Sequence, residues 1–307
     1  MKDKKSRPRS SEIQKHSRIP VVADVSPLHS PGCQSGLTSA ATLKEAPQNS
    51  VKAKLLNGQP VIGVTISVNN VEVAAQAANL GFDFLWLEME HAPLSLETVR
   101  NIVLATRGLP AVPLARPPVN EVWTAKRLLD AGVLGVIFPF TSTPELARQA
   151  AAACRYPTRG VRGSGAGLAQ FRWSAPEGYY DFADENVMVI TVIEDAPGLA
   201  HIEEIAATPG IDVLFIGTSD LSFSLGLRGE QNHPKLDAAI AKIVAAGKKN
   251  GKVLGRPART PAEFKRFRKD GFLFFQGPTD LDFMTAGAAQ YLEPLGKVHR
   301  VAFAGGL

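Results

Sequence analysis

The amino-acid sequence predicts a single (β/α)8 TIM barrel, and three observations support this fold class. After residue 50, short apolar runs alternate with longer segments of helical period. Eight such strand–helix units follow one another, in a length of roughly 250 residues that is usual for this barrel. The apolar runs are continuous, which indicates parallel strands covered on both faces. We therefore expect residues 51–307 to form one barrel domain.

The first half of this domain supplies four of the units. Its strands are short runs rich in β-branched and aromatic residues, and they are expected at 61–66, 82–89, 111–116 and 133–140. The segments between them repeat apolar residues at helical spacing, which predicts helices at 71–80, 95–108, 120–132 and 143–156. Ser95 is placed to cap the second of these helices and Gly108 to end it.

The second half supplies the other four units after a long interruption. Residues 157–186 are irregular and rich in Gly and Arg, and we expect this segment to be a mobile or anion-contacting loop at the functional site. It lacks the GxGxxG spacing of a dinucleotide-binding turn and follows a helix, which disfavours that function. Strands are expected at 187–194, 212–217, 252–256 and 272–276, and helices at 198–210, 233–251, 260–271 and 279–296.

A doubly wound open sheet is the alternative fold for such an alternation. That fold normally carries a Gly-rich turn after its first strand. No such turn follows the expected strand 61–66, which favours the barrel.

The first 50 residues have a different composition, rich in Ser, Pro, Lys and Arg, without a sustained helix or strand period. We expect this segment to be a disordered or loosely ordered tail. It lacks the apolar core of a secretory signal, which favours a cytoplasmic protein. An organellar transit peptide is the alternative, and the acidic residues Asp3, Glu12 and Asp24 count against it.

The net charge of +5 is concentrated in this tail. Residues 1–50 hold eight Lys or Arg and four Asp or Glu, which leaves 26 basic and 25 acidic residues in the barrel. The barrel therefore lacks the basic surface of a nucleic-acid-binding protein. The longest apolar stretch, residues 133–140, is too short to cross a membrane.

The chain has two cysteines, Cys33 and Cys154, without the spacing of a metal site. We expect both to be reduced thiols of an intracellular protein. Cys154 lies in an expected helix, where a buried packing role is commoner than catalysis.

Titratable residues stand where several expected strands end. They are Glu88, His91, Arg116, Glu194 and Asp220. Side chains alternate between the faces of a strand, which directs Glu88, Arg116 and Glu194 into the barrel. Because the carboxyl ends of barrel strands meet at one mouth, we expect all five groups to converge there.

Two carboxylates from neighbouring strands, Glu194 and Asp220, suit a divalent metal such as Mg²⁺, Mn²⁺ or Co²⁺, with water and substrate oxygens completing its coordination. They lack the His or Cys ligands typical of zinc. A single carboxylate at a strand end would more often cap a helix or pair with an arginine. Their occurrence on adjacent strands, each beside a Gly- or Pro-bearing turn, favours the metal.

The remaining groups suit proton transfer and charge stabilisation. His91 is expected to act as a general base, with Glu88 orienting its ring. Arg116 suits an enolate or carboxylate oxygen because its charge is permanent. The turn after residue 216 offers backbone N–H groups for a substrate carboxylate beside the metal. The structural alternatives are a surface histidine and a salt-bridged arginine.

Several motifs that occur in order resemble the HpcH/HpaI aldolase family. They are EMEHAPLS (88–95), ARP (115–117), RYPTRGVRG (155–163), VIED (192–195) and FIGTSDLSFSLG (215–226). Each motif alone is unspecific, but their agreement over residues 51–295 is specific. Members of this family are metal-dependent class II aldolases that handle pyruvate enolate, including aldolases of 4-hydroxy-2-oxoheptanedioate.

The resemblance implies a barrel that assembles as a hexamer, a trimer of dimers, with the last helix exchanged between paired subunits. It assigns the metal to Glu194 and Asp220, the catalytic histidine to His91 and the pyruvate-contacting arginine to Arg116. It also assigns binding of the pyruvate carboxylate to the backbone at Ser219 and Asp220. The chain departs from the family pattern at Glu88, where Asp is typical, and at Val192, where Gln is common. The change at Val192 bears on the family's usual substrate more than on the chemistry.

On these grounds we expect a metal-dependent lyase whose partners are pyruvate, or another 2-oxo acid, and an aldehyde. Arg116 and the metal would stabilise the enolate as the C3–C4 bond breaks. His91, oriented by Glu88, would move the proton of the C4 hydroxyl. The small or apolar residues Thr65, Phe140 and Val192 indicate modest, poorly charged aldehydes.

Three alternatives remain open. The same metal enolate could serve decarboxylation of oxaloacetate, and no sequence feature separates the two reactions. A CoA-ester lyase of the citrate lyase β-subunit type shares the resemblance, but would need a nucleotide-binding surface that the sequence does not reveal. A catalytically silent barrel that serves as an oligomeric or binding protein would require the five converging groups to have no function.

Overall fold

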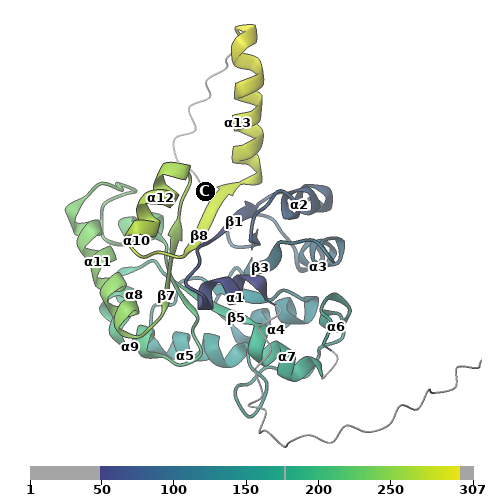
Figure 1. Cartoon of the computed structure of the whole chain (residues 1–307). Helices are drawn as coiled ribbons and strands as arrows, with labels where there is room; N and C mark the ends of the chain where they lie inside the picture. Colours follow the sequence, from purple (N-terminus) through teal and green to yellow (C-terminus); the bar gives the residue numbers. More distant parts are fainter. Residues whose placement is uncertain (1–48, 176–177, 298–307) are drawn as a thin grey trace, which may run out of the picture. The chain divides into compact units, whose positions relative to one another are not determined.

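The computed structural model describes residues 49–175 and 178–297, and its centre is a closed barrel of eight parallel strands (Figure 1). The strands are β1 (Val61–Ile66), β2 (Phe84–Glu88), β3 (Val112–Arg116), β4 (Gly135–Phe138), β5 (Met188–Ile193), β6 (Val213–Ile216), β7 (Val253–Pro257) and β8 (Phe274–Thr279). Each strand pairs with the next in the chain, and β8 pairs with β1. The predicted (β/α)8 TIM barrel is therefore confirmed.

The expected helices alternate with these strands. The helices are α1 (Ser50–Leu56), α2 (Val71–Ala78), α3 (Leu96–Ala105), α4 (Val122–Ala131), α5 (Pro144–Ala153), α6 (Ala169–Arg172), α7 (Tyr179–Asn186), α8 (Ala196–Ala200), α9 (Ile202–Ala207), α10 (Thr218–Ser224), α11 (Pro234–Lys249), α12 (Pro261–Lys269) and α13 (Asp280–Leu292), with a 3₁₀ helix, η1 (Glu293–Leu295). The expected helix 198–210 is two short helices, α8 and α9, with His201 between them. None of the helices is long and apolar enough, within the described segments, to span a membrane.

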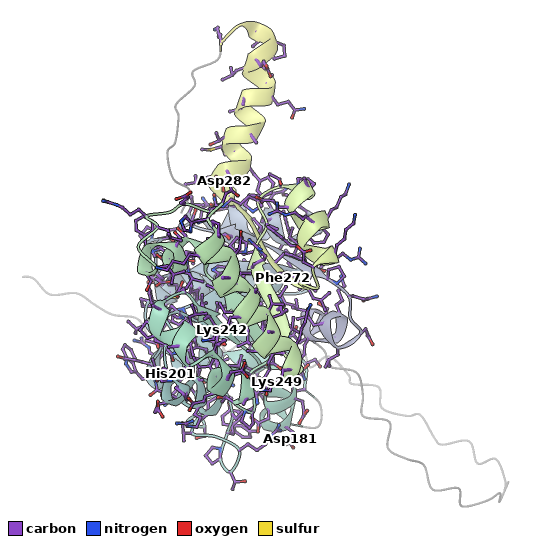
Figure 2. The ribbon with its side chains drawn as sticks, turned by 90° about the vertical axis from the view of Figure 1, so that its left-hand side faces the viewer. Asp181, His201, Lys242, Lys249, Phe272 and Asp282 are labelled. Atoms are coloured by element: carbon purple, nitrogen blue, oxygen red, sulfur yellow. The ribbon has the colours of Figure 1, made fainter. Side chains whose placement is uncertain are left out.

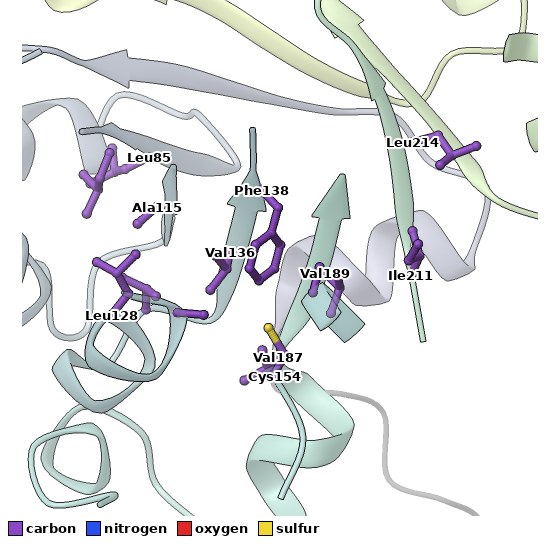
Figure 3. Packing of buried hydrophobic residues seen from close by; sticks show 14 of the residues in the cluster. Leu85, Ala115, Leu128, Val136, Phe138, Cys154, Val187, Val189, Ile211 and Leu214 are labelled. Atoms are coloured by element: carbon purple, nitrogen blue, oxygen red, sulfur yellow. The ribbon is translucent and has the colours of Figure 1, made fainter. Parts of the chain in front are cut away.

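Alternate side chains of each strand face the two sides of the barrel wall. Phe84 and Trp86 of β2 face the interior, where Phe84 stacks on Phe274 with ring centroids 4.6 Å apart. Leu85 and Leu87 pack in the outer layer under the helices (Figure 3). A Cβ atom at residue 63 would lie 2.2 Å from the Phe84 ring, so only glycine fits that position of β1. This alternation directs Glu88, two residues beyond Trp86, into the mouth.

Helix α1 closes the end of the barrel opposite the mouth. Its Val51 and Leu55 belong to the interior apolar layer. The fully buried Asn49 caps this helix and donates from its side chain to the carbonyl of Asn186 over 2.9 Å. The sequence assigned Asn49 and Ser50 to the tail, and the remaining tail residues, 1–48, lie outside the described part of the chain.

The Gly- and Arg-rich segment lies far from the mouth. It connects α5 to β5, and therefore lies at the amino ends of the strands, where it also forms α6 and α7. Figure 2 shows Asp181 of α7 and Asp282 of α13 at opposite ends of the barrel. Arg162 is 1% exposed, with its guanidinium 4.5 Å from the Tyr156 ring and 3.2 Å from Asp130. The expectation of an active-site loop is wrong, because the segment follows helix α5 and not the end of strand β4.

Candidate active site

The carboxyl ends of β2, β3, β5 and β6 deliver the predicted polar residues to one cavity of about 1180 Å³. His91, Arg116, Val192, Glu194, Ser219 and Asp220 all line this cavity. Glu88 lines a smaller recess of about 20 Å³ that shares His91 and Arg116 with it. The structure thus brings all seven predicted site residues together.

Glu88 is a buried carboxylate that is fully engaged by protein groups. Its Oε2 accepts hydrogen bonds from Arg116 Nε at 2.7 Å and from Trp86 Nε1 at 3.0 Å. Its Oε1 accepts from the backbone N–H groups of Glu90 and His91. Burial would raise the pKa of the Glu88 carboxyl, but Arg116 and these backbone donors hold it below its usual value.

The predicted partnership between Glu88 and the His91 ring takes a different form in the structure. Glu88 contacts the backbone of His91, whereas the carboxylate nearest the ring belongs to Glu90, with Oε2 3.7 Å from Nε2. Glu90 is not among the site residues predicted from the sequence. Its position next to the histidine, just beyond the end of β2, is the signal that could have identified it.

Glu90 is poised between Arg116 and His91. Its Oε2 lies 2.9 Å from Arg116 Nη1, yet this buried atom makes no hydrogen bond of good geometry within the described residues. Burial raises the pKa of the Glu90 carboxyl, although Arg116 and His91 oppose that shift. Glu90 is therefore available to accept a proton or a hydrogen bond from substrate or water.

Arg116 is fixed from three sides. Glu88 and Glu90 both pair with its guanidinium, which also lies 5.5 Å from the centre of the Trp86 ring. The register of β2 and β3 places Glu88 directly opposite Arg116, which explains how the strands orient the pair. Such a clamped guanidinium can hold an anionic oxygen with little loss of side-chain entropy.

Glu194 lies at the end of β5 with only 2% of its surface exposed. Its Oε1 accepts a hydrogen bond of 2.7 Å from the backbone N–H of Phe140. Burial raises the pKa of the Glu194 carboxyl to about 8, and the negative charges of Glu90 and Asp220 add to the shift. A Cβ atom at Gly217 would lie 2.6 Å from Glu194 Oε2, so the glycine makes room for this carboxylate.

Asp220 and Ser219 belong to the first turn of the helix α10, where the sequence predicted a turn with backbone N–H groups available to a substrate carboxylate. The backbone N–H groups of such a turn have no partner within their own helix. The half-buried Asp220 carboxylate has no hydrogen bond or ion pair among the described residues. Glu194 and Asp220 are thus two carboxylates that line one cavity, and neither forms a salt bridge with another described residue.

This donor set fits a divalent metal. Mg²⁺ and Mn²⁺ prefer oxygen ligands, and Mg²⁺ is commonly held by one or two carboxylates together with substrate and water. A cation between Glu194 and Asp220 would offset the desolvation that raises the pKa of Glu194. Within residues 49–175 and 178–297, no group of three or more His, Cys, Asp or Glu side chains could hold a metal. A metal here would accordingly have two protein ligands.

Comparisons with known proteins identify the family of this chain. The model of the family described as HpcH/HpaI aldolase/citrate lyase matches residues 62–286. A hydroxypyruvate/pyruvate aldolase of Paraburkholderia phytofirmans is 35% identical, over 80% of this chain and 96% of its own. A 5-keto-4-deoxy-D-glucarate aldolase of Klebsiella pneumoniae is 35% identical, over 76% of this chain and 91% of its own.

A third relative and a solved structure extend the match. A 4-hydroxy-2-oxo-heptane-1,7-dioate aldolase of Salmonella heidelberg is 33% identical, over 85% of this chain and 99% of its own. The crystal structure of an HpcH/HpaI aldolase/citrate lyase family protein from Burkholderia cenocepacia superimposes with a TM-score of 0.75 at 33% identity. That alignment covers 81% of this chain and all of the other.

Proposed function

The chain belongs to the HpcH/HpaI aldolase/citrate lyase family, and on that premise we propose that it is a metal-dependent aldolase acting on 4-hydroxy-2-oxo acids. The reaction joins pyruvate to an aldehyde or splits the joined product. One observation carries the proposal: Glu194 and Asp220, neither of which forms a salt bridge within the described residues, line the same cavity as the clamped guanidinium of Arg116. The metal would be Mg²⁺, Mn²⁺ or Co²⁺.

Glu194 and Asp220 would hold the cation. When bound, it would act as a Lewis acid toward the negative charge that develops on the substrate's oxo oxygen. Arg116 faces the same cavity and would stabilise that charge from the protein side. The first-turn N–H groups at Ser219 and Asp220 would donate hydrogen bonds to the pyruvate carboxylate.

His91, with Glu90 beside it, would transfer the proton of the C4 hydroxyl. In the cleavage direction, His91 takes the proton of the C4 hydroxyl as the C3–C4 bond breaks, which releases the aldehyde and leaves the enolate of pyruvate. A proton added at C3 then completes pyruvate. Glu90 lies 3.7 Å from the His91 ring and would orient it, while Glu88 holds Arg116 and the backbone of residues 90 and 91 in place.

We further propose that α13 packs against a second copy of the chain within a hexamer. All residues from Leu281 to Tyr291 are exposed, and the apolar Leu281, Met284 and Tyr291 follow one stripe of the helix. In Figure 1 this helix extends beyond the ring formed by the other helices. An apolar stripe of this kind is a typical subunit contact.

The test is turnover of a 4-hydroxy-2-oxo acid before and after removal of metal. We expect activity to disappear in EDTA, to return with Mn²⁺, and to fall sharply in Arg116→Ala. Full activity in chelator, or unchanged turnover in Arg116→Ala, would contradict the proposal. Measuring CO₂ release from oxaloacetate in parallel separates aldol cleavage from decarboxylation.

A further inference from the structure

A polar recess opens from the mouth cavity between β1, β7 and β8. It is lined by Thr65, Gln276 and Thr279 in addition to Glu88, His91 and Arg116. His91, Arg116, Pro257, Arg259 and Gln276 line both the recess and the main cavity, so the two spaces adjoin. The recess therefore adjoins the groups assigned to proton transfer and charge stabilisation.

Strand geometry aims Gln276 into this recess. Phe274, two residues earlier on β8, lies in the interior layer, and the alternation of side chains directs Gln276 inward at the next level. Gln276 is half-buried, and its Nε2 donates a hydrogen bond of 3.2 Å to Thr65 Oγ1. The Thr65 hydroxyl, 4% exposed, donates in turn to the carbonyl of Gly277 over 3.4 Å.

This chain of hydrogen bonds leaves Gln276 with unused capacity. A glutamine amide has two N–H donors and a carbonyl acceptor. One side-chain N–H donates to Thr65. The described residues provide no partner for the side-chain carbonyl oxygen or for the second side-chain N–H. Gln276 thus presents a donor and an acceptor side by side, which is the pattern that a hydroxyl group satisfies.

The size of the recess matches a group of this kind. Its volume is about 20 Å³, and a cavity needs roughly 10–15 Å³ to hold one water-sized group. Pyruvate carries no hydroxyl. Glu194 and Asp220, which are assigned to its oxygens, line the main cavity and not the recess, whereas Arg116 lines both. A hydroxyl in the recess would therefore belong to the aldehyde.

We propose that Gln276, held by Thr65, is a specificity-determining residue that selects aldehydes bearing a hydroxyl group. This inference rests on the proposed aldolase function and names the class of its second substrate. It narrows the modest, poorly charged aldehydes that Thr65, Phe140 and Val192 indicated in the sequence to those with a hydroxyl group. The reaction would join C3 of pyruvate to the aldehyde carbon, with the proton lost from C3 balanced by one gained at the new C4 hydroxyl.

The experiment compares glycolaldehyde with acetaldehyde, which differ by one hydroxyl, at saturating pyruvate and Mn²⁺. The measured quantity is kcat/KM for glycolaldehyde divided by kcat/KM for acetaldehyde. We expect this ratio to fall by about fivefold to tenfold in Gln276→Leu, the usual effect of one or two hydrogen bonds to a neutral group. Thr65→Val should lower it in the same direction. Gln170→Leu makes the same change on the exposed surface of α6 and should leave the ratio at the wild-type value.

Exchange of the pyruvate methyl protons with deuterated water, followed by NMR, separates this inference from the proposed function. Wild-type protein without exchange or aldol product would refute the function and the inference together. Exchange that persists in Gln276→Leu with an unchanged aldehyde ratio would overturn only the inference. Loss of exchange in a folded Gln276→Leu protein would also overturn it, because the residue would then act on pyruvate.

A charged aldehyde provides the last discrimination. Succinic semialdehyde carries a carboxylate instead of a hydroxyl. If it is used in preference to glycolaldehyde, and Gln276→Leu leaves that preference intact, then positive charge at the mouth selects the aldehyde and the inference is wrong. The cavity is lined by Arg116, Arg228, Arg256, Arg259 and Arg266.

Discussion

Glu88 and Arg116 lie directly opposite each other on β2 and β3, and two contacts of 2.7 and 2.5 Å join the carboxylate to the guanidinium. The same carboxylate accepts from the backbone N–H groups of Glu90 and His91. One buried side chain therefore sets the position of the anion-binding arginine and of the loop that carries the histidine. The order of residues along the chain does not reveal this double role.

Replacing Glu88 by Gln should impair catalysis without preventing folding. The variant keeps the shape of the side chain but removes the charge that holds Arg116, and misplacement of a catalytic group costs on the order of 100-fold. We expect kcat/KM to fall by about that factor, and Glu88→Asp to lose less because it keeps the charge. Steady-state kinetics and circular dichroism would check both expectations. Glu145→Gln removes an exposed carboxylate from Arg148 and serves as the matched control, with wild-type activity expected.

The barrel was accessible to sequence analysis because its signals are local. Apolar runs of strand length and helices of regular period identify the eight units, and a period of two places Glu88, Arg116 and Glu194 on inner faces. The family resemblance then joined these residues into one site. Both kinds of reasoning depend on position along the chain. The strand pattern placed five of the residues at one mouth, the resemblance added Val192 and Ser219, and the structure brings all seven together there.

The remainder depends on contacts that a linear pattern does not contain. Glu88 and Glu90 are two residues apart, and only the path of the chain after β2 decides which carboxylate approaches the His91 ring. Gln276 is separated from Thr65 by most of the chain, and closure of the barrel through the pairing of β8 with β1 brings them together. The Arg-rich segment was misplaced because composition alone does not tell the two ends of a barrel apart.

Metal binding should stabilise the protein as well as activate it. A ligand at 100 times its Kd adds about 2.7 kcal/mol to the free energy of unfolding, which corresponds to a rise of roughly 5 °C or more in Tm for a barrel of this size. We expect Mn²⁺ to raise the Tm of EDTA-treated protein, but not that of Glu194→Gln or Asp220→Asn. Differential scanning fluorimetry measures the shift, and Glu203→Gln on the exposed surface of α9 should respond like wild type. A full shift in both site variants would place the metal elsewhere.

The exposed stripe of α13 leads to a prediction about assembly. Met284 is 65% exposed within one chain, so Met284→Arg has little packing to disturb in the barrel. In an assembly that buries this helix, the substitution would place an unpaired charge in an apolar contact. We expect the variant to elute with a lower mass in size-exclusion chromatography with light scattering, while Gln170→Arg on α6 retains the wild-type mass. A wild-type protein that is monomeric at micromolar concentration would refute the proposed subunit contact.

Cys154 should be inert in the folded protein. It is fully buried at the end of α5, near Val187 (Figure 3), and burial raises the pKa of its thiol to about 12. The thiolate is the reactive form, so the folded chain should resist thiol reagents near pH 8. In a Cys33→Ser background, we expect almost no reaction with Ellman's reagent until denaturant is added. Rapid labelling of the native protein would contradict the buried environment.

The same burial makes stability depend on pH. Because the folded thiol of Cys154 binds its proton more tightly than the unfolded thiol, this residue lowers the free energy of unfolding as pH rises above about 9. Cys154→Ala should remove that contribution.

Gly217 should be essential for the metal site and dispensable for the barrel. Its backbone has a φ of −79°, which any residue can adopt, so alanine would not strain the chain at this position. The added Cβ would instead meet Glu194 Oε2 at 2.6 Å and Glu194 Cβ at 2.7 Å. Because the backbone N–H of Phe140 already fixes the other oxygen of Glu194, the carboxylate has little freedom to move aside.

We expect Gly217→Ala to weaken Mn²⁺ binding by at least about tenfold, the usual cost of disturbing the orientation of a metal ligand, as measured by calorimetric titration. Gly167→Ala adds the same methyl group where no atom lies within 4 Å and should bind Mn²⁺ like wild type. Equal affinity in the two variants would mean that Glu194 does not hold the metal through this oxygen.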